Sequence, residues 1–526
     1  MARVEIYDTT LRDGAQAEGI SYSIQDKLRI AGALAELGVA YIEGGWPNPT
    51  HQVDVEFFTR AAQQDLGGSK LAAFGSTRRA DRAAGDDPQL QALVASGAPV
   101  ITIFGKSWTI HVDEVLRVSR EANLEMIADS VAWLAQHAEQ VIFDAEHFFD
   151  GFATDREYAL AALVAAAEAG AARVVLCDTN GGTLPAAIEA AVRAAREVVG
   201  VPIGIHAHDD IGCGVANSIV AVAAGATHVQ GTMNGLGERC GNANLCQIIP
   251  NVMLKMGHEA IATDGLEQLT RISRLISELS NQTHNQRQGY VGASAFAHKG
   301  GTHIDAMRKL PQAYQHVPAE LVGNRSRVLV SDQAGAGALA WKLDALYPDL
   351  DKRDPRVRRL LERLKELEAA GYQFEAAEAS FQLLARRALD DYHPHFELIN
   401  YRVRLDRVNG DGTIHEATVK VRVGDGERHT VAEGNGPVDA LSNALRKALG
   451  RAYPDVHRIQ LSDYKVRVLD SRAATAASVR VLIEYTADDH VFGTVGVSED
   501  VVAASWQALA DGIAYGLEKL GVEPVG

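Results

Sequence analysis

The chain has 526 residues, and 51 Lys and Arg against 68 Asp and Glu give it a formal net charge of −17. This length predicts two or three domains, each large enough to bury a core. The acidic balance excludes an electrostatic grip on nucleic acid or on an anionic membrane, because both need a basic face. No apolar run approaches the roughly 18 residues of a membrane span, no secretory signal is evident, and four cysteines make no disulfide framework. These features predict a soluble cytoplasmic enzyme.

The first half of the chain alternates short β-rich runs with helical patterns such as Ile24–Leu37 and Leu184–Val199. Strands alternating with helices at this spacing predict a parallel sheet, and eight such units predict closure into a (β/α)8 TIM barrel. The alternative is an open doubly wound sheet, which the lack of a G-x-G-x-x-G motif after the first strand disfavours. The predicted strands are Val4–Tyr7, Ala40–Glu43, Leu71–Phe74, Val100–Phe104, Gln140–Asp144, Arg173–Cys177, Pro202–Ala207 and Thr227–Gln230.

Changes in sequence texture predict three domains. A catalytic TIM barrel spans residues 1–256, a helical linker spans residues 257–390, and an α+β domain spans residues 391–526. The linker mixes helical patterns with two predicted loops, AFAHKGGTHIDA and PQAYQHVPAELVGN. Its most charged segment, DPRVRRLLERLKELEAA, predicts a helix with Pro355 in the first turn.

The C-terminal domain is predicted to contain two similar halves. In each half, strands run into a Thr-Val strand end, a turn and an alanine-rich helix, and Gly-Asp-Gly turns stand at residues 410–412 and 424–426. The domain carries no cluster of His, Cys or paired carboxylates, so we expect a structural or dimerisation role, or the binding of an effector. The predicted strands are Phe396–Val408, Ile414–Val423, Lys465–Leu469 and Val479–Tyr485.

Catalytic residues of a TIM barrel lie at the C-terminal ends of its strands. In this sequence nearly every such position carries a metal-ligand type or a proton-transfer group. Asp8, Glu43 and Asp178 are interpreted as orienting groups.

His206 and His208 form the most informative pair, because a spacing of two in a strand points both imidazoles to one face. Asp13 would complete a set of three protein ligands, and Asn242 offers an amide oxygen or a supporting contact. This donor set suits a divalent ion such as Mn, Mg, Zn or Co. The alternative is a pair of solvated or core histidines without a metal.

Arg12 and Glu146 are the candidates for the remaining chemistry. A fixed guanidinium at Arg12 would hold a carboxylate or stabilise a developing enolate oxygen, unless it only makes a salt bridge at the rim. Glu146 would act as an acid or a base if burial tunes it, or else form a structural ion pair.

Three motifs in this order resemble the family of 2-isopropylmalate, homocitrate and citramalate synthases: DTTLRDG at Asp8–Gly14, HAHDDIGCGVAN at His206–Asn217 and NGLGERCGNA at Asn234–Ala243. The C-terminal domain also resembles the regulatory domain of that family, with EGNGPVDAL at Glu433–Leu441. Within the family, the segments YIEGGWP, FGKSWTIHV and FDAEHFFDGF are most similar to the citramalate branch.

The resemblance implies a Claisen condensation of acetyl-CoA with a 2-oxo acid, followed by thioester hydrolysis. For the citramalate branch the oxo acid is pyruvate and the pathway is isoleucine biosynthesis. It also implies that Asp13, His206 and His208 bind the metal and that Arg12 stabilises oxyanion charge.

The resemblance assigns four further roles. Thr179 resembles the contact to the substrate carboxylate, His303 and Glu146 match the catalytic histidine and glutamate, and Tyr314 resembles a tyrosine of the same step. Because His303 and Tyr314 follow the barrel in sequence, we expect a partner subunit to supply them, which predicts a homodimer. The implied effector of the C-terminal domain is isoleucine for the citramalate branch and leucine for the isopropylmalate branch.

Three other functions compete with this hypothesis. The first is a 2-isopropylmalate synthase, which performs the same chemistry on a larger oxo acid; a bulky Trp46 near the oxo-acid pocket would favour pyruvate instead. The second is a lyase on the same barrel, against which the C-terminal domain argues. The third is an amino-acid-binding regulatory protein with a degenerate barrel, which the intact set of candidate catalytic residues disfavours.

Overall fold

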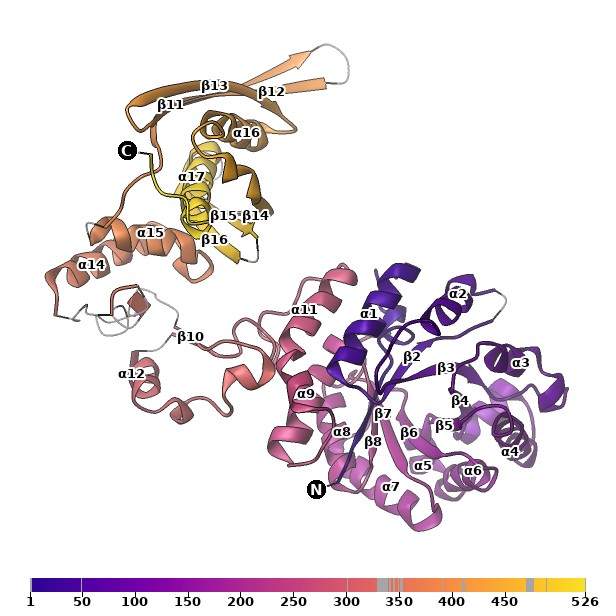
Figure 1. Ribbon diagram of the computed structural model, residues 1–526. Helices are drawn as coiled ribbons and strands as arrows, with labels where there is room; N and C mark the ends of the chain where they lie inside the picture. The colour runs from indigo at the N-terminus through magenta and orange to yellow at the C-terminus, as the bar shows by residue number, and fades with distance from the viewer. Residues whose placement is uncertain are drawn as a thin grey trace. The chain divides into compact units, whose positions relative to one another are not determined.

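The computed structural model describes residues 2–48, 50–299, 301–328, 339, 342–343, 346–348, 350, 353–389, 391–408, 412–469, 477–488 and 490–525. These residues form two compact units (Figure 1). The first unit contains Met1–Phe296 and Gln315–Ser326, and the second contains Ala297–Tyr314 and Arg327–Gly526. No helix in the described part of the chain is long and apolar enough to cross a membrane.

The first unit is a closed barrel of eight parallel strands arranged in sequence order. Closure occurs where β1 pairs with β8, with Glu5 opposite His228. The predicted TIM barrel is therefore confirmed, and the alternative of an open sheet is wrong. The strands are β1 (Glu5–Asp8), β2 (Tyr41–Gly45), β3 (Lys70–Ser76), β4 (Val100–Lys106), β5 (Gln140–Glu146), β6 (Arg173–Asp178), β7 (Ile203–Ala207) and β8 (His228–Gly231).

Helix α1 shows how local sequence sets the boundaries of a barrel helix. Ser23 and Asp26 form a reciprocal capping box at its start, and Gly38 ends it with φ of 87°, a conformation that glycine adopts without steric cost. The other helices of this unit are α2 (Gln52–Ala61), α3 (Pro88–Ala95), α4 (Arg120–Leu134), α5 (Phe148–Thr154), α6 (Arg156–Glu168), α7 (Pro185–Val198), α8 (Gly214–Ala223), α9 (Leu245–Pro250), α10 (Thr263–Glu267) and α11 (Leu269–Leu279), and α1 itself spans Ile24–Leu37.

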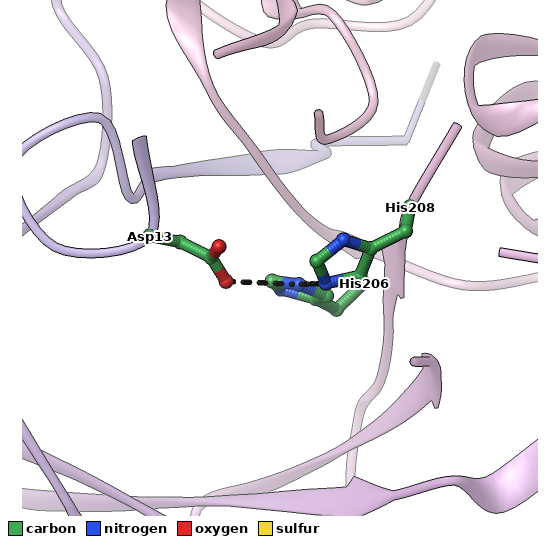
Figure 2. Close-up of side chains that lie close together, drawn as sticks. All are labelled: Asp13, His206 and His208. Atoms are coloured by element: carbon green, nitrogen blue, oxygen red, sulfur yellow. Dashed lines mark hydrogen bonds and ion pairs between the residues drawn. The ribbon is translucent and has the colours of Figure 1, made fainter. Parts of the chain in front are cut away.

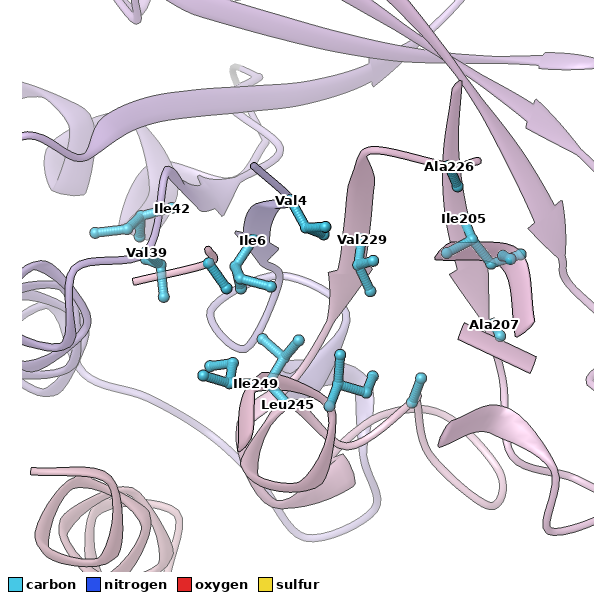
Figure 3. Close-up of a cluster of buried hydrophobic side chains, with 14 of the residues drawn as sticks. Val4, Ile6, Val39, Ile42, Ile205, Ala207, Ala226, Val229, Leu245 and Ile249 are labelled. Atoms are coloured by element: carbon cyan, nitrogen blue, oxygen red, sulfur yellow. The ribbon is translucent and has the colours of Figure 1, made fainter. Parts of the chain in front are cut away.

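Two apolar layers hold the barrel. In the first layer, strand residues such as Ile6 and Val229 belong to one large buried cluster with helix residues such as Leu245 (Figure 3). Burying a side chain of this size contributes about 1.5–3 kcal/mol. A second, smaller cluster contains Tyr7, Tyr41, Ala72, Val100, Ile142, Val175 and Cys177.

The second unit contains helix α12 (Gly301–Lys309), where the sequence predicted a loop. The prediction of a loop is wrong. Gly301 and Thr302 are weak helix formers and favoured a loop, but Ile304 is buried in an apolar cluster, and this burial stabilises the helix. The charged helix was predicted correctly: α14 spans Pro355–Ala369, and the Asp354 side chain caps it. Helix α15 follows at Glu378–Ala388, and β9 (Ala297–His298) pairs with β10 (Arg327–Val328).

The end of the second unit confirms the two similar halves. Each half is a three-stranded antiparallel sheet followed by one helix. The turn at residues 424–426 joins two strands as predicted, whereas the predicted turn at 410–412 falls largely outside the described residues. The elements are β11 (Glu397–Val408), β12 (Gly412–Val423), β13 (Gly426–Gly434) and α16 (Pro437–Leu449), then β14 (Ile459–Val468), β15 (Val479–Ala487), β16 (His490–Ser498) and α17 (Val501–Lys519).

Candidate metal and catalytic site

Asp13, His206 and His208 converge at one end of the barrel (Figure 2). One ligand atom from each lies within 4.8 Å of the others, and all three residues are buried. Nε2 of His206 is 3.6 Å from Oδ2 of Asp13 and 3.4 Å from Nε2 of His208. The structure therefore brings together the three residues that the sequence predicted as metal ligands.

Neighbouring elements position these side chains. His206 lies on β7, and His208 forms a β-bridge with Asn242 just beyond that strand. Asp13 follows β1, where its N–H donates to Oγ1 of Thr9 over 3.2 Å. Asn242 thus lies beside the cluster, and its part in metal binding stays a prediction.

The donor atoms fit a divalent cation. Oδ1 of Asp13 and Oδ1 of Asn242 are buried and have no hydrogen-bond partner among the described residues. Buried polar atoms are normally paired, so these two unpartnered oxygens beside the cluster fit the binding of a cation. Two imidazole nitrogens that bind one ion at about 2.0–2.1 Å lie roughly as far apart as the Nε2 atoms of His206 and His208, which are separated by 3.4 Å.

The pKa shifts favour the protonation states that bind a metal. Burial alone would raise the pKa of Asp13, but the Arg12 guanidinium and the two imidazoles outweigh it and lower this pKa to about 2. Burial lowers the pKa of His208 to about 4. At neutral pH, Asp13 is therefore ionised and His208 is neutral.

Arg12 is held by two carboxylates. Its Nε donates to Oε2 of Glu43 over 2.6 Å, and its Nη1 donates to Oδ2 of Asp13 over 2.9 Å. Glu43 is fully buried and also accepts from the hydroxyls of Tyr7, over 2.6 Å, and Thr9. Glu43 is thus an orienting group, as the sequence indicated, and the Arg12 guanidinium is fixed beside the candidate metal ligands.

The rings of Trp46, Phe74 and Phe104 lie together next to Arg12, and we call them the aromatic cluster. The guanidinium carbon of Arg12 lies 3.7 Å from the centre of the Phe74 ring. Phe74 and Phe104 stack at 5.6 Å, and Trp46 approaches them edge-on at 5.7 and 5.8 Å. The aromatic cluster therefore forms an apolar surface beside the charged part of the site.

Glu146, at the end of β5, forms an ion pair with Lys106 at the end of β4. Lys106 is not among the residues predicted from the sequence. The signal that would have found it is the strand register, since Lys106 and Glu146 stand opposite each other on neighbouring parallel strands. The pair places a positive and a negative group together at the same end of the barrel as Asp13.

Thr179 is oriented by a neighbouring backbone. The N–H of His147 donates to Oγ1 of Thr179 over 2.8 Å, and His147 adopts a left-handed conformation with φ of 57°. Because the hydroxyl oxygen accepts this bond, the hydroxyl hydrogen is available to donate to a ligand.

His303 and Tyr314 lie in the second unit, whereas the other predicted site residues lie in the first. The two rings stack on each other with centres 4.2 Å apart. Tyr314 is 46% exposed, and His303 is also exposed. His303 and Tyr314 thus contact each other, and the prediction that they act in the catalytic site of the barrel stays a prediction.

Known families cover almost all of the chain. The HMGL-like family matches residues 3–276, a homocitrate synthase post-HMGL domain-like family matches 290–371, and the LeuA allosteric (dimerisation) domain matches 375–517.

Full-length relatives refine this assignment. The chain is 50% identical to an (R)-citramalate synthase of Geobacter sulfurreducens, over 99% of this chain and 98% of that protein. It is 48% identical to an (R)-citramalate synthase of Aquifex aeolicus, over 98% of each chain. A probable 2-isopropylmalate synthase of Methanopyrus kandleri is 33% identical over 97% of this chain and 98% of its own length. The chain therefore belongs to the (R)-citramalate synthase family.

Proposed function

We propose that this chain is an (R)-citramalate synthase, which condenses acetyl-CoA with pyruvate and releases citramalate and CoA. The new carbon–carbon bond joins the acetyl methyl carbon to the keto carbon of pyruvate, and water then cleaves the thioester. The observation that carries the proposal is the fixed Arg12 guanidinium beside the Asp13, His206 and His208 cluster in a chain of this family.

Asp13, His206 and His208 are proposed to hold a divalent cation, with Asn242 as an adjacent oxygen donor. When bound, such an ion supplies Lewis-acid polarisation of the substrate keto oxygen. Mn, Mg, Zn and Co all suit two imidazoles combined with oxygen ligands.

Arg12 and Thr179 are proposed to act on pyruvate itself. The guanidinium, already oriented by Glu43, would stabilise the negative charge that develops on the keto oxygen. The hydroxyl oxygen of Thr179 already accepts a hydrogen bond from the N–H of His147. Its hydrogen is therefore available and would donate to the pyruvate carboxylate.

Glu146 and His303 are proposed to move the proton that leaves the acetyl methyl group, with Tyr314 assisting the same step. A homodimer, in which a partner subunit supplies His303 and Tyr314, is supported by the LeuA dimerisation domain at residues 375–517. The stacking of these two rings supports a shared role.

Preference for pyruvate is proposed to come from the aromatic cluster of Trp46, Phe74 and Phe104. Its rings lie next to Arg12 and would occupy the space that a branched oxo acid needs there. Each additional methylene changes binding by about 1–3 kcal/mol, so a few side chains can decide between pyruvate and 2-oxoisovalerate.

The C-terminal domain is proposed to bind isoleucine as a feedback effector, which would place the reaction in isoleucine biosynthesis. The LeuA allosteric family match supports this role. We also propose a catalytic barrel at residues 1–256, a linker at 257–390 and a regulatory domain at 391–526, which the three family matches approximate. A cytoplasmic location is supported by four free thiols, of which Cys240 is exposed.

The test is CoA release from acetyl-CoA with a panel of 2-oxo acids, with and without EDTA. We expect pyruvate to be turned over well above 2-oxoisovalerate, and EDTA to abolish turnover. A preference for 2-oxoisovalerate would support a 2-isopropylmalate synthase instead. No release with any oxo acid would refute the condensation.

A further inference from the structure

A chain of buried side chains lies behind His206. Nδ1 of His206 is 2.8 Å from Oε1 of Gln230, and Nε2 of Gln230 donates to Oδ1 of Asp144 over 3.0 Å. Gln230 is fully buried, His206 is 5% exposed and Asp144 is 3% exposed. Water is therefore largely excluded from both hydrogen bonds.

Strand register brings the three residues together. His206 on β7 and Gln230 on β8 are direct neighbours in the register of two adjacent strands. Asp144 belongs to β5, which is not a neighbour of β8 in the barrel. The side-chain amide of Gln230 thus crosses the barrel interior. Its oxygen contacts His206 on β7, and its nitrogen contacts Asp144 on β5.

The direction of these hydrogen bonds determines which His206 nitrogen is free. The Asp144 carboxyl oxygen accepts from the Gln230 NH2 group, so the Gln230 oxygen faces His206. An amide oxygen can only accept, and Nδ1 of His206 must therefore carry the proton. The lone pair is left on Nε2, the atom that faces Asp13 and His208.

We propose that Gln230 is a positioning residue of the metal site, which fixes the ring orientation and tautomer of His206 and is itself oriented by Asp144. The inference rests on the metal site of the proposed function. It requires no contact between Gln230 and the ion. Partners of this kind typically change metal affinity by 10–100-fold when they are removed.

The experiment measures Mn²⁺ binding by calorimetry to the metal-stripped full chain. Gln230→Met keeps the bulk of the side chain and removes its acceptor, and we expect its Kd for Mn²⁺ to rise about 10–100-fold. Gln64→Met is the matched control, since Gln64 donates to the backbone oxygen of Leu28 away from the site, and its Kd should stay unchanged.

Two further variants separate positioning from packing. Gln230→Glu retains an oxygen acceptor for Nδ1 of His206 but loses the NH2 group that donates to Asp144, so its Mn²⁺ affinity should lie between those of the wild type and Gln230→Met. Asp144→Leu removes the group that orients Gln230, and it should weaken Mn²⁺ binding. Asp144→Leu decides the question if Gln230→Met fails to fold.

The outcomes separate this inference from the proposed function. A folded Gln230→Met chain or a folded Asp144→Leu chain with wild-type Kd would overturn the positioning role while leaving the metal site intact. Failure of the wild-type chain itself to bind Mn²⁺ would instead remove the metal site, and the positioning role with it.

Discussion

Nε of Arg12 lies 2.6 Å from Oε2 of the fully buried Glu43, so the guanidinium is anchored from inside the barrel rather than from solvent. Burial alone would lower the pKa of Arg12, but the carboxylates of Glu43 and Asp13 more than offset it and raise this pKa. The charge of Arg12 is therefore permanent and its position fixed. Such a preorganised donor stabilises developing oxyanion charge at little reorganisation cost.

Replacing Arg12 with lysine should lower kcat by about 10²–10³-fold, the usual effect of removing one donor to an oxyanion. A lysine ammonium is a single point charge and cannot reproduce the planar fork that pairs with Glu43 and Asp13. Steady-state CoA release measures the effect. Arg193→Lys, an exposed change on α7, is the control and should behave as wild type. Equal kcat for Arg12→Lys and wild type would contradict the assigned role.

Shortening Trp46 to alanine should relax the selection of the oxo acid. Removing an aromatic ring from the aromatic cluster opens space beside Phe74 and Phe104. The ratio of kcat/KM for 2-oxobutyrate to that for pyruvate should rise at least tenfold, because added methylenes are worth about 1–3 kcal/mol each. Trp133→Ala, on helix α4, controls for the loss of a tryptophan elsewhere. An unchanged ratio would show that Trp46 does not set specificity.

Changing Thr179 to valine should raise the KM for pyruvate about tenfold or more, since a hydrogen bond to a charged group contributes roughly 1.5–3 kcal/mol. The KM for acetyl-CoA should change less, because Thr179 is assigned to the pyruvate carboxylate. Thr59→Val on the exposed side of α2 provides a matched control. A rise confined to the KM for acetyl-CoA would reassign Thr179 to the other substrate.

The buried Asp8 should make the free energy of unfolding depend on pH. Burial raises the pKa of Asp8 from 3.8 to about 7, against the opposing bonds from Thr10. The unfolded chain therefore loses this proton at lower pH than the folded chain. The stability that Asp8 contributes is complete below about pH 4 and declines as pH rises through 7.

Asp8→Asn lacks this proton equilibrium and can still accept from Thr10. Relative to the variant, the wild-type chain should therefore lose free energy of unfolding between pH 4 and pH 7, on the order of 4 kcal/mol for a shift of this size. Urea unfolding of both chains at several pH values measures the difference. A difference that is constant with pH would rule out a raised pKa at Asp8.

Local patterns predicted most of the barrel and the metal cluster. Alternating short strands and helices were enough for the closed barrel, and the spacing of His206 and His208 placed both imidazoles on one face. Asp13 could be added because the ends of parallel strands meet at one rim. These predictions depended on periodicity and on the common rim at which the strands of a barrel end.

Features that depend on contacts across the barrel could not be predicted in the same way. Gln230 and Lys106 are ordinary polar residues in sequence, and their roles become visible only when strand register sets them against His206 and Glu146. Helix α12 was missed because buried Ile304, rather than local propensity, stabilises it. The assignment of His303 and Tyr314 to the reaction still comes from family resemblance.

The central claim is tested most directly by following the new carbon–carbon bond. The full chain is incubated with pyruvate and acetyl-CoA labelled with ¹³C in the methyl group, with and without EDTA, and the product is observed by NMR. We predict that the label appears in the methylene group of citramalate, next to its quaternary carbon, and that EDTA prevents this. Label that stays in acetyl-CoA or free acetate, or citramalate formed equally well in EDTA, would contradict a metal-dependent citramalate synthase.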